Sequence, residues 1–140
     1  MIQVFVYGTL KPGEANYQAY CGDRPHRAQP AYTWGRLYHL PTYGYPAMTH
    51  GMERIMGVLL TFEAVDILAI LDPLETYEEG RSPEQNEYDR QHIEVFTPGG
   101  QPLGRVWGYV MRPALVEQHG GIWVASGQWS GVDYPKAGGF

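Results

Sequence analysis

The sequence predicts an α+β domain with about five strands and one main helix, the strands forming a mostly antiparallel or mixed sheet able to close into a barrel. Three observations carry this prediction. Runs of alternating β-branched and aromatic residues recur along the 140-residue chain. Only one segment has the apolar spacing of an amphipathic helix. Glycines also lie inside predicted strands, at Gly35, Gly57 and Gly108, where closure requires a sheet to bend.

The first strand is predicted at residues 2–7, because β-branched residues occupy every second position there. A short helix is expected near residues 16–20. The second strand is predicted at residues 32–40, and Gly35 inside it indicates a bulge or a close approach of another backbone. Residues 41–51 are predicted to form a loop.

The third predicted strand, residues 54–62, leads into the main helix, residues 63–71. Apolar residues recur from Val65 at three-residue spacing, which predicts one buried face. Thr61 is expected to cap the start of this helix. Pro73 is expected to follow its end, because proline cannot continue a helix without losing a hydrogen bond.

The remaining elements are shorter, and the periodicity fades after Pro113. The sequence predicts a polar loop at residues 80–87, strands at 88–97 and 105–111 joined by a turn at 98–100, and a partly irregular tail from about residue 114. No repeat or linker interrupts the chain, so residues 1–140 are expected to form a single domain.

Composition narrows the function. The formal net charge is −5, which argues against general binding to nucleic acid or to an anionic membrane. Most acidic residues lie between Glu63 and Glu94, which predicts a solvated acidic face. Cys21 is the only cysteine and is expected to be a packing residue. Without a signal-peptide pattern or a membrane-spanning apolar run, the protein is expected to be cytoplasmic.

The first chemical feature is Tyr7-Gly8-Thr9-Leu10, where the first strand ends and turns. Gly8 can adopt a positive φ and leaves space for a ligand. Successive backbone N–H groups in such a turn can converge on a carboxylate, a phosphate or an oxyanion. An ordinary strand-turn is the alternative. The spacings of a P-loop and of a dinucleotide-binding fingerprint are absent.

The second feature is Leu71-Asp72-Pro73-Leu74-Glu75, directly after the predicted helix. Pro73 disfavours helical geometry at Asp72, so Asp72 and Glu75 have the spacing of a capping box that starts a new helical turn. In the other interpretation, Glu75 lies in a pocket beside Leu71 and Leu74. Burial would then raise the pKa of its carboxyl and make Glu75 a usable general base near neutral pH.

Other side chains exclude some chemistries. A few of the 11 tyrosines are expected to line a small polar pocket with their hydroxyls. The five histidines lack the spacing of metal ligands, so the sequence predicts no metal. No Gly-x-Ser-x-Gly elbow occurs, which argues against a serine hydrolase.

These residues resemble the γ-glutamyl cyclotransferase-like family, nearest to its γ-glutamylamine cyclotransferase and plant avirulence-induced branch. The resemblance extends over nearly the whole chain, with its motifs in the same order. The motifs are Val4 to Gly13 with Asn16, Leu71 to Glu75, Tyr88-Asp89-Arg90, Arg105 to Val110, and Gly127-Gln128-Trp129.

The resemblance implies a six-stranded mixed barrel with short flanking helices and no cofactor. It also implies a small γ-glutamyl substrate and a reaction that releases 5-oxoproline when the α-amine attacks its own γ-carbonyl. Glu75 is the implied catalytic base. The implied substrate-binding residues are Tyr7, Gly8, Thr9 and Leu10, with Tyr88 and Tyr109 as additional pocket hydroxyls.

The chain departs from the family pattern at two places. Thr76 stands where the family usually has glycine, and the stretch Glu78–Glu87 is longer than usual, which could change the amine that leaves. Two other functions remain open. One is a non-catalytic module that binds a small carboxylate or amino-acid-like ligand in the same pocket. The other is a protein that binds a basic partner through its acidic residues 63–94. The oligomeric state stays open.

Overall fold

The computed structural model describes residues 1–24 and 26–137. Within these residues, six strands, two α-helices and two short helical turns follow one another. They are β1 (Ile2–Val6), the π-helical turn η1 (Gln18–Gly22), β2 (His26–Leu40), β3 (Tyr45–Phe62), α1 (Ile67–Leu74), the 3-10 turn η2 (Pro83–Gln85), β4 (Asp89–Phe96), β5 (Pro102–Val110), α2 (Pro113–Gln118) and β6 (Ile122–Trp123).

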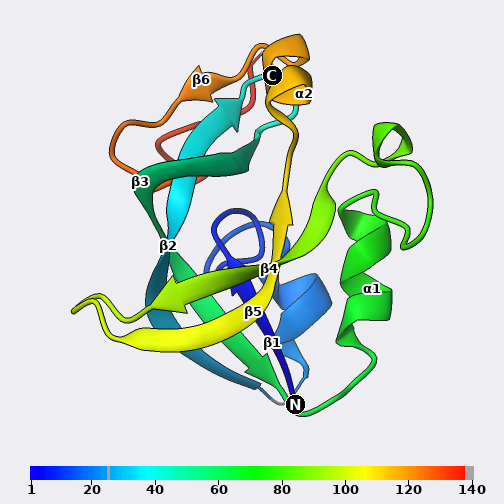
Figure 1. Ribbon diagram of the computed structural model, residues 1–140, viewed down its shortest axis with the longest axis vertical. Helices are drawn as coiled ribbons and strands as arrows, with labels where there is room; N and C mark the ends of the chain where they lie inside the picture. The colour runs from blue at the N-terminus through cyan, green and yellow to red at the C-terminus, as the bar shows by residue number, and fades with distance from the viewer. Residues whose placement is uncertain (25, 138–140) are drawn as a thin grey trace.

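The sheet closes on itself. Its strand order is β3-β1-β5-β4-β2-β6, and β2 also pairs with β3, so β1 to β5 form a ring to which β6 is added. Among the described strands, only the β1–β5 pair is parallel. Figure 1 shows β2 and β3 as the long strands, with α1 beside the sheet and α2 and β6 together at one end. The predicted α+β class and the six-stranded, mostly antiparallel, barrel-like sheet are confirmed.

The β2–β3 hairpin is longer than the sequence predicts. β2 begins at His26, and β3 begins at Tyr45, so the predicted loop at residues 41–51 is wrong beyond residue 44. Gly44, with φ of 76°, closes the tight turn. Pro46 obscured the strand, because a proline inside a run is a signal against strand structure; here it pairs with His39 across the hairpin.

A break in the ladder bends this hairpin. Gly35 pairs with Glu53 whereas Arg36 pairs with Thr49, which leaves residues 50–52 outside the ladder. A Cβ on Gly35 would lie 2.7 Å from the Thr49 carbonyl oxygen, so this approach requires glycine. The predicted irregularity at Gly35 is therefore confirmed.

The main helix begins and ends later than predicted. β3 ends at Phe62, the predicted end, where it pairs with Ile2 and His26. Thr61 therefore lies in a strand and does not cap the helix, which starts only after Asp66. Val65 is 77% exposed and does not belong to the buried face. Pro73 lies inside the last turn of α1 rather than beyond its end.

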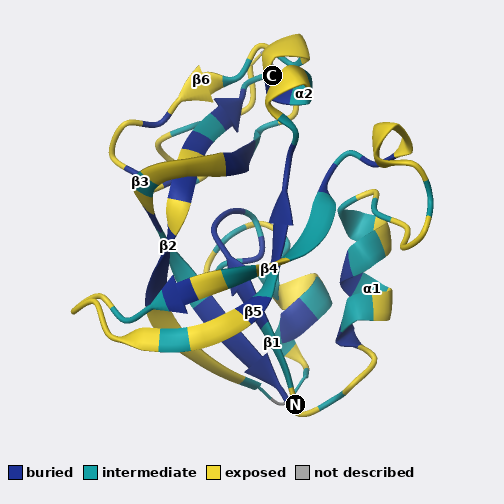
Figure 2. Cartoon of the chain, in the orientation of Figure 1, coloured by how far each residue is buried: buried dark blue, intermediate teal, exposed yellow. Residues whose placement is uncertain are grey.

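Buried side chains form two apolar clusters on opposite faces of β1. Val4 and Val6 belong to the cluster that contains Leu71 of α1, whereas Phe5 and Tyr7 belong to the other. β1 is thus packed on both faces, and its last three residues, Val4 to Val6, are buried, which Figure 2 shows in dark blue. Cys21 is fully buried in the first cluster, as expected for a packing residue. None of the helices in the described residues is long and apolar enough to cross a membrane.

The chain after Pro113 contributes to the second cluster. α2 and β6 precede an irregular stretch in which Val124 and Trp129 are nonetheless buried, with 1% and 2% of their surface exposed. The indole N–H of Trp129 donates to Nδ1 of His39 at 3.0 Å. Residues 138–140 of the predicted tail lie outside the described residues.

Candidate active site

A cavity of about 100 Å³ lies where the end of β1, the C-terminus of α1, the start of β3, the segment just before β4 and the end of β5 meet. Every residue that the sequence assigned to a site lines this cavity: Tyr7, Gly8, Thr9, Leu10, Glu75, Tyr88 and Tyr109. Asn16, Tyr45, Pro46 and Glu87 also line it. No group of three or more His, Cys, Asp or Glu side chains in the described residues could hold a metal ion.

The turn after β1 is fixed by its own hydrogen bonds. The N–H of Lys11 donates to the Gly8 carbonyl at 3.0 Å, and Asn16 donates from its backbone to the Thr9 carbonyl at 2.9 Å and from Nδ2 to Thr9 Oγ1 at 3.0 Å. In the part of the chain that the structure describes, the N–H groups of Gly8, Thr9 and Leu10 donate to no backbone carbonyl. They remain free for an anionic ligand.

Gly8 is required for a different reason than expected. Its φ is not positive. Instead, a Cβ on Gly8 would lie 2.6 Å from Cγ of Pro46, because the bent β2–β3 hairpin brings Pro46 against the end of β1. The absence of a side chain therefore lets two cavity walls meet.

Glu75 is placed by the way α1 ends. The N–H of Thr76 donates to the Pro73 carbonyl at 3.2 Å and that of Tyr77 to the Asp72 carbonyl at 2.9 Å. With Thr76 at φ of 52°, these bonds form a Schellman motif in which Glu75 is the C-cap. The capping box predicted from Asp72 and Glu75 is wrong, because α1 continues through both Asp72 and Pro73.

Thr76 is strained at this position. Within residues 1–24 and 26–137 it is the one residue other than glycine with positive φ, and β-branched side chains disfavour that conformation. Thr76→Gly is expected to raise the free energy of unfolding by about 1 kcal/mol, measured by chemical denaturation. Thr76→Ala keeps the Cβ and serves as the control with a smaller gain. A less stable Thr76→Gly variant would contradict this account of the strain.

The environment of Glu75 favours its protonated form. Burial, together with the smaller effects of the nearby acids Glu87 and Asp72, raises the pKa of the carboxyl from 4.5 to about 8. Among the residues that the structure describes, no hydrogen bond that would favour the charged form counteracts these effects. A carboxyl of this kind can accept and return a proton near neutral pH.

The raised pKa has a consequence for stability. The unfolded chain releases the Glu75 proton near pH 4.5 and the folded chain near pH 8, so ionisation of Glu75 destabilises the fold as the pH rises through this interval. Glu75→Gln is therefore expected to be more stable than the wild type by on the order of 3 kcal/mol at pH 7 and by little at pH 5. Chemical denaturation at both pH values measures this difference. An identical difference at pH 5 and pH 8 would contradict a buried, titrating Glu75.

The tyrosine hydroxyls are already engaged with the protein. Tyr7 donates to the Tyr109 carbonyl at 2.7 Å and accepts from the Met48 N–H at 3.1 Å. Tyr88 donates to the Pro46 carbonyl at 2.6 Å. Burial raises the pKa of both phenols, so they keep their protons. Their main role is to join the cavity walls, and the Tyr88 oxygen can only accept a hydrogen bond from a ligand.

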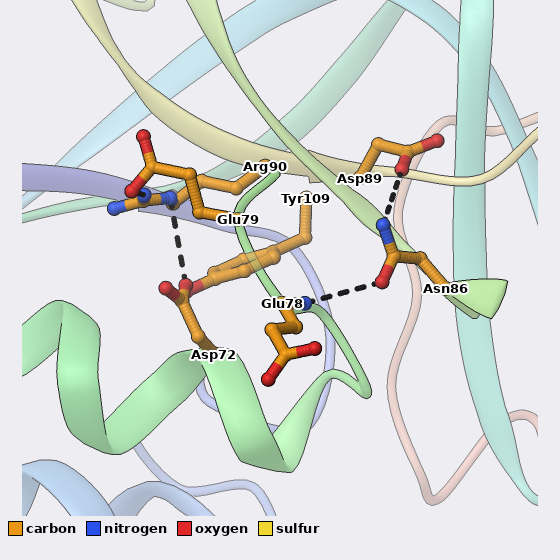
Figure 3. A network of polar contacts seen from close by, with 7 residues as sticks. All are labelled: Asp72, Glu78, Glu79, Asn86, Asp89, Arg90 and Tyr109. Atoms are coloured by element: carbon orange, nitrogen blue, oxygen red, sulfur yellow. Dashed lines mark hydrogen bonds and ion pairs between the residues drawn. The ribbon is translucent and has the colours of Figure 1, made fainter. Parts of the chain in front are cut away.

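Tyr109 is held by a charged pair. Its hydroxyl donates to Oδ1 of Asp72 at 2.7 Å, and Nε of Arg90 lies 3.5 Å from the same oxygen. The Arg90 side chain is 8% exposed, and its guanidinium lies over the ring of Trp107 at 4.5 Å. Figure 3 shows Asp72 extending from α1 to both partners. The contact explains why Asp72 is not free to cap a helix.

Sequence patterns did not identify Tyr45, Pro46 or Glu87 as cavity residues. Tyr45 and Pro46 arrive through hairpin pairing between distant residues, for which no local signal exists. Glu87 directly precedes Tyr88 of the Tyr-x-Arg motif, and that adjacency is the one local signal that could have pointed to it.

Solved structures share this fold. An AIG2-like protein from Mus musculus has 19% identity and a TM-score of 0.64, covering 83% of this chain and 82% of that chain. A uropathogenic E. coli-specific protein has 16% identity and a TM-score of 0.63, covering 99% and 97%. The Kluyveromyces lactis allophanate hydrolase matches 94% of this chain with 21% of its own, at 13% identity and a TM-score of 0.65. These structures define the class of the fold.

Sequence comparison gives the family. The family model described as gamma-glutamyl cyclotransferase, AIG2-like, matches residues 4–131, and the chain belongs to this family. No curated protein matches the chain significantly. The resemblance found in the motifs is thereby confirmed.

Proposed function

We propose that this protein is a cyclotransferase that releases 5-oxoproline from a small γ-glutamyl substrate, with Glu75 as the general base. One observation carries the proposal: the Glu75 carboxyl, with its pKa raised to about 8, shares a small cavity with the free N–H groups of Gly8, Thr9 and Leu10. Membership of the γ-glutamyl cyclotransferase family supports the reaction class.

In the proposed reaction, Glu75 takes a proton from the α-ammonium of the substrate. The neutral amine attacks its own γ-carbonyl carbon, which forms the ring C–N bond and places a negative charge on the oxygen. The N–H groups of Gly8 to Leu10 stabilise that oxyanion. Glu75 returns its proton to the departing nitrogen, and the bond to the leaving amine breaks as the oxyanion re-forms the carbonyl. The ring nitrogen releases its remaining extra proton to solvent, which leaves the neutral lactam. Because attack is intramolecular, a cavity that holds the glutamyl chain folded supplies much of the rate.

The test is product formation from a panel of γ-glutamyl amines and γ-glutamyl dipeptides, with 5-oxoproline measured by mass spectrometry. The α-N-acetyl derivative of each substrate is the control, because its blocked nitrogen cannot cyclise. We expect 5-oxoproline only from substrates with a free α-amine. Failure of every substrate to give product above its control would refute the proposal, and binding without product would instead identify the non-catalytic alternative.

A further inference from the structure

The cavity contains a second carboxyl that the proposed reaction does not use. Glu87 lines the cavity together with Glu75, and no lysine or arginine is among the lining residues. One acid suffices to move the proton, and a second carboxylate in a small cavity opposes the ionisation of the first. The position of the Glu87 carboxylate in this cavity therefore favours a ligand that carries a positive charge.

Glu87 is held in one position. The hydroxyl of Tyr45 donates to Oε1 of Glu87 at 2.6 Å, and the Glu87 N–H donates to the Thr76 carbonyl at 3.0 Å. The nearest basic group is the imidazole of His119, whose Nε2 lies 3.9 Å from the same Oε1. Within the described residues, Glu87 forms no ion pair with a lysine or an arginine. Since 24% of its side chain is exposed, Glu87 lies at the opening of the cavity.

The segment that carries Glu87 is built to hold it. Asn86 is buried; its Oδ1 accepts from the Glu78 N–H at 3.1 Å, and its Nδ2 donates to Asp89 at 3.2 Å, as Figure 3 shows. Nη1 of Arg112 donates to the Asn86 carbonyl at 3.1 Å. The stretch Glu78–Glu87, which is longer than the family pattern, is therefore a fixed loop that ends at the cavity.

The cavity is large enough for only one end of a γ-glutamyl substrate. At about 100 Å³ it is far smaller than the roughly 300–1,000 Å³ of pockets that enclose drug-sized ligands. A folded glutamyl chain occupies such a space, so the leaving amine must extend through the opening. The α-ammonium must lie at Glu75 to lose its proton, which leaves Glu87 to face the leaving group.

We propose that Glu87 is a specificity-determining residue that selects γ-glutamyl conjugates whose leaving amine carries a second positive charge, as in the conjugates of diamines. This inference rests on the proposed function and names its substrate class. A cation a few bonds beyond the scissile nitrogen meets the carboxylate at the rim of the cavity, where water screens the attraction only partly.

The test compares three conjugates of similar length. The leaving groups are 1,4-diaminobutane (cationic), pentylamine (neutral) and 4-aminobutanoate (anionic). We expect kcat/KM to be roughly tenfold higher for the cationic than for the neutral conjugate, and lowest for the anionic one. Glu87→Gln, whose carbonyl can still accept from Tyr45, is expected to remove this order. Glu84→Gln makes the same charge change on the exposed part of the loop and should preserve it.

Each outcome distinguishes this inference from the proposed function. Turnover of all three conjugates at equal kcat/KM overturns the role of Glu87 and leaves the reaction standing. A loss of kcat/KM by the same factor for all three in Glu87→Gln also overturns it, because Glu87 would then contact the glutamyl group. Calorimetric titration of Glu75→Gln with the conjugates measures the same preference without turnover. If Glu75→Gln binds the three conjugates with equal affinity, or binds none of them, the inference is overturned. If Glu87→Gln does not fold, the comparison of kcat/KM for the three conjugates in the wild type decides whether the inference holds.

Discussion

Glu75→Gln is expected to lower kcat/KM for 5-oxoproline release by roughly 10²–10⁴-fold, the contribution of a positioned general base. Glutamine keeps the size of the side chain and its carbonyl oxygen, but it cannot take the proton from the α-ammonium. The substrate cavity and the turn at Gly8 to Leu10 are unaffected by the change. Measurement of initial rates of product formation for both proteins gives the ratio.

The pH profile provides a second readout of the same group. The base form of Glu75 is needed, so kcat/KM of the wild type should rise with pH through an apparent pKa of about 8. This rise of kcat/KM with pH should be missing from the residual activity of Glu75→Gln. Glu84→Gln, an acid-to-amide change on the exposed loop, should keep both the rate and the profile. Wild-type activity in Glu75→Gln would rule out the proposed mechanism.

Activity and stability should change in opposite directions at Glu75. The same burial that prepares the carboxyl to exchange a proton destabilises its ionised form, so the glutamine variant is expected to lose most of its activity and to be more stable at pH 7. A loss of activity accompanied by a gain of stability cannot be attributed to misfolding. The two measurements together therefore test the catalytic role rather than the integrity of the fold.

The sequence predictions are accurate for elements that depend on residues close together in the sequence, and they fail for elements that depend on contacts between distant residues. β1 and β4 were predicted because side-chain alternation is local. The first part of β3 was missed because Tyr45 and Pro46 are strand residues only through pairing with β2. The end of α1 was also missed, since Asp72 satisfies its carboxyl through Tyr109 and Arg90, far away in sequence, rather than as a helix cap.

The candidate site shows the same division. The motif residues of the Tyr7–Leu10 turn and Glu75 line one cavity, which their spacing alone could not show. Glu87 looked like one acid among many in a polar loop. Its place at the cavity depends on the buried Asn86 and on Tyr45 from a different strand, and neither contact has a sequence pattern.

The C-terminal segment gives the largest expected change in stability. Trp129→Ala is expected to lower the free energy of unfolding by about 3–5 kcal/mol. Trp129 is 2% exposed within the second apolar cluster, and its loss leaves both a cavity and an unpaired Nδ1 on the buried His39. Trp123→Ala is the control: Trp123 is 47% exposed, and its removal should cost no more than about 1 kcal/mol.

Chemical denaturation of the two variants shows whether the C-terminal segment is packed as part of the fold. If both variants lost the same small amount of unfolding free energy, the residues near Trp129 would lie outside the cooperative core. The expected effect also reaches the candidate site. Nζ of Lys11, in the turn after β1, donates to the Trp129 carbonyl. A variant that loosens this segment should therefore weaken the hold on the turn and raise KM for the γ-glutamyl substrate. Trp123→Ala, whose indole instead bonds Glu53 at the surface, should leave KM unchanged.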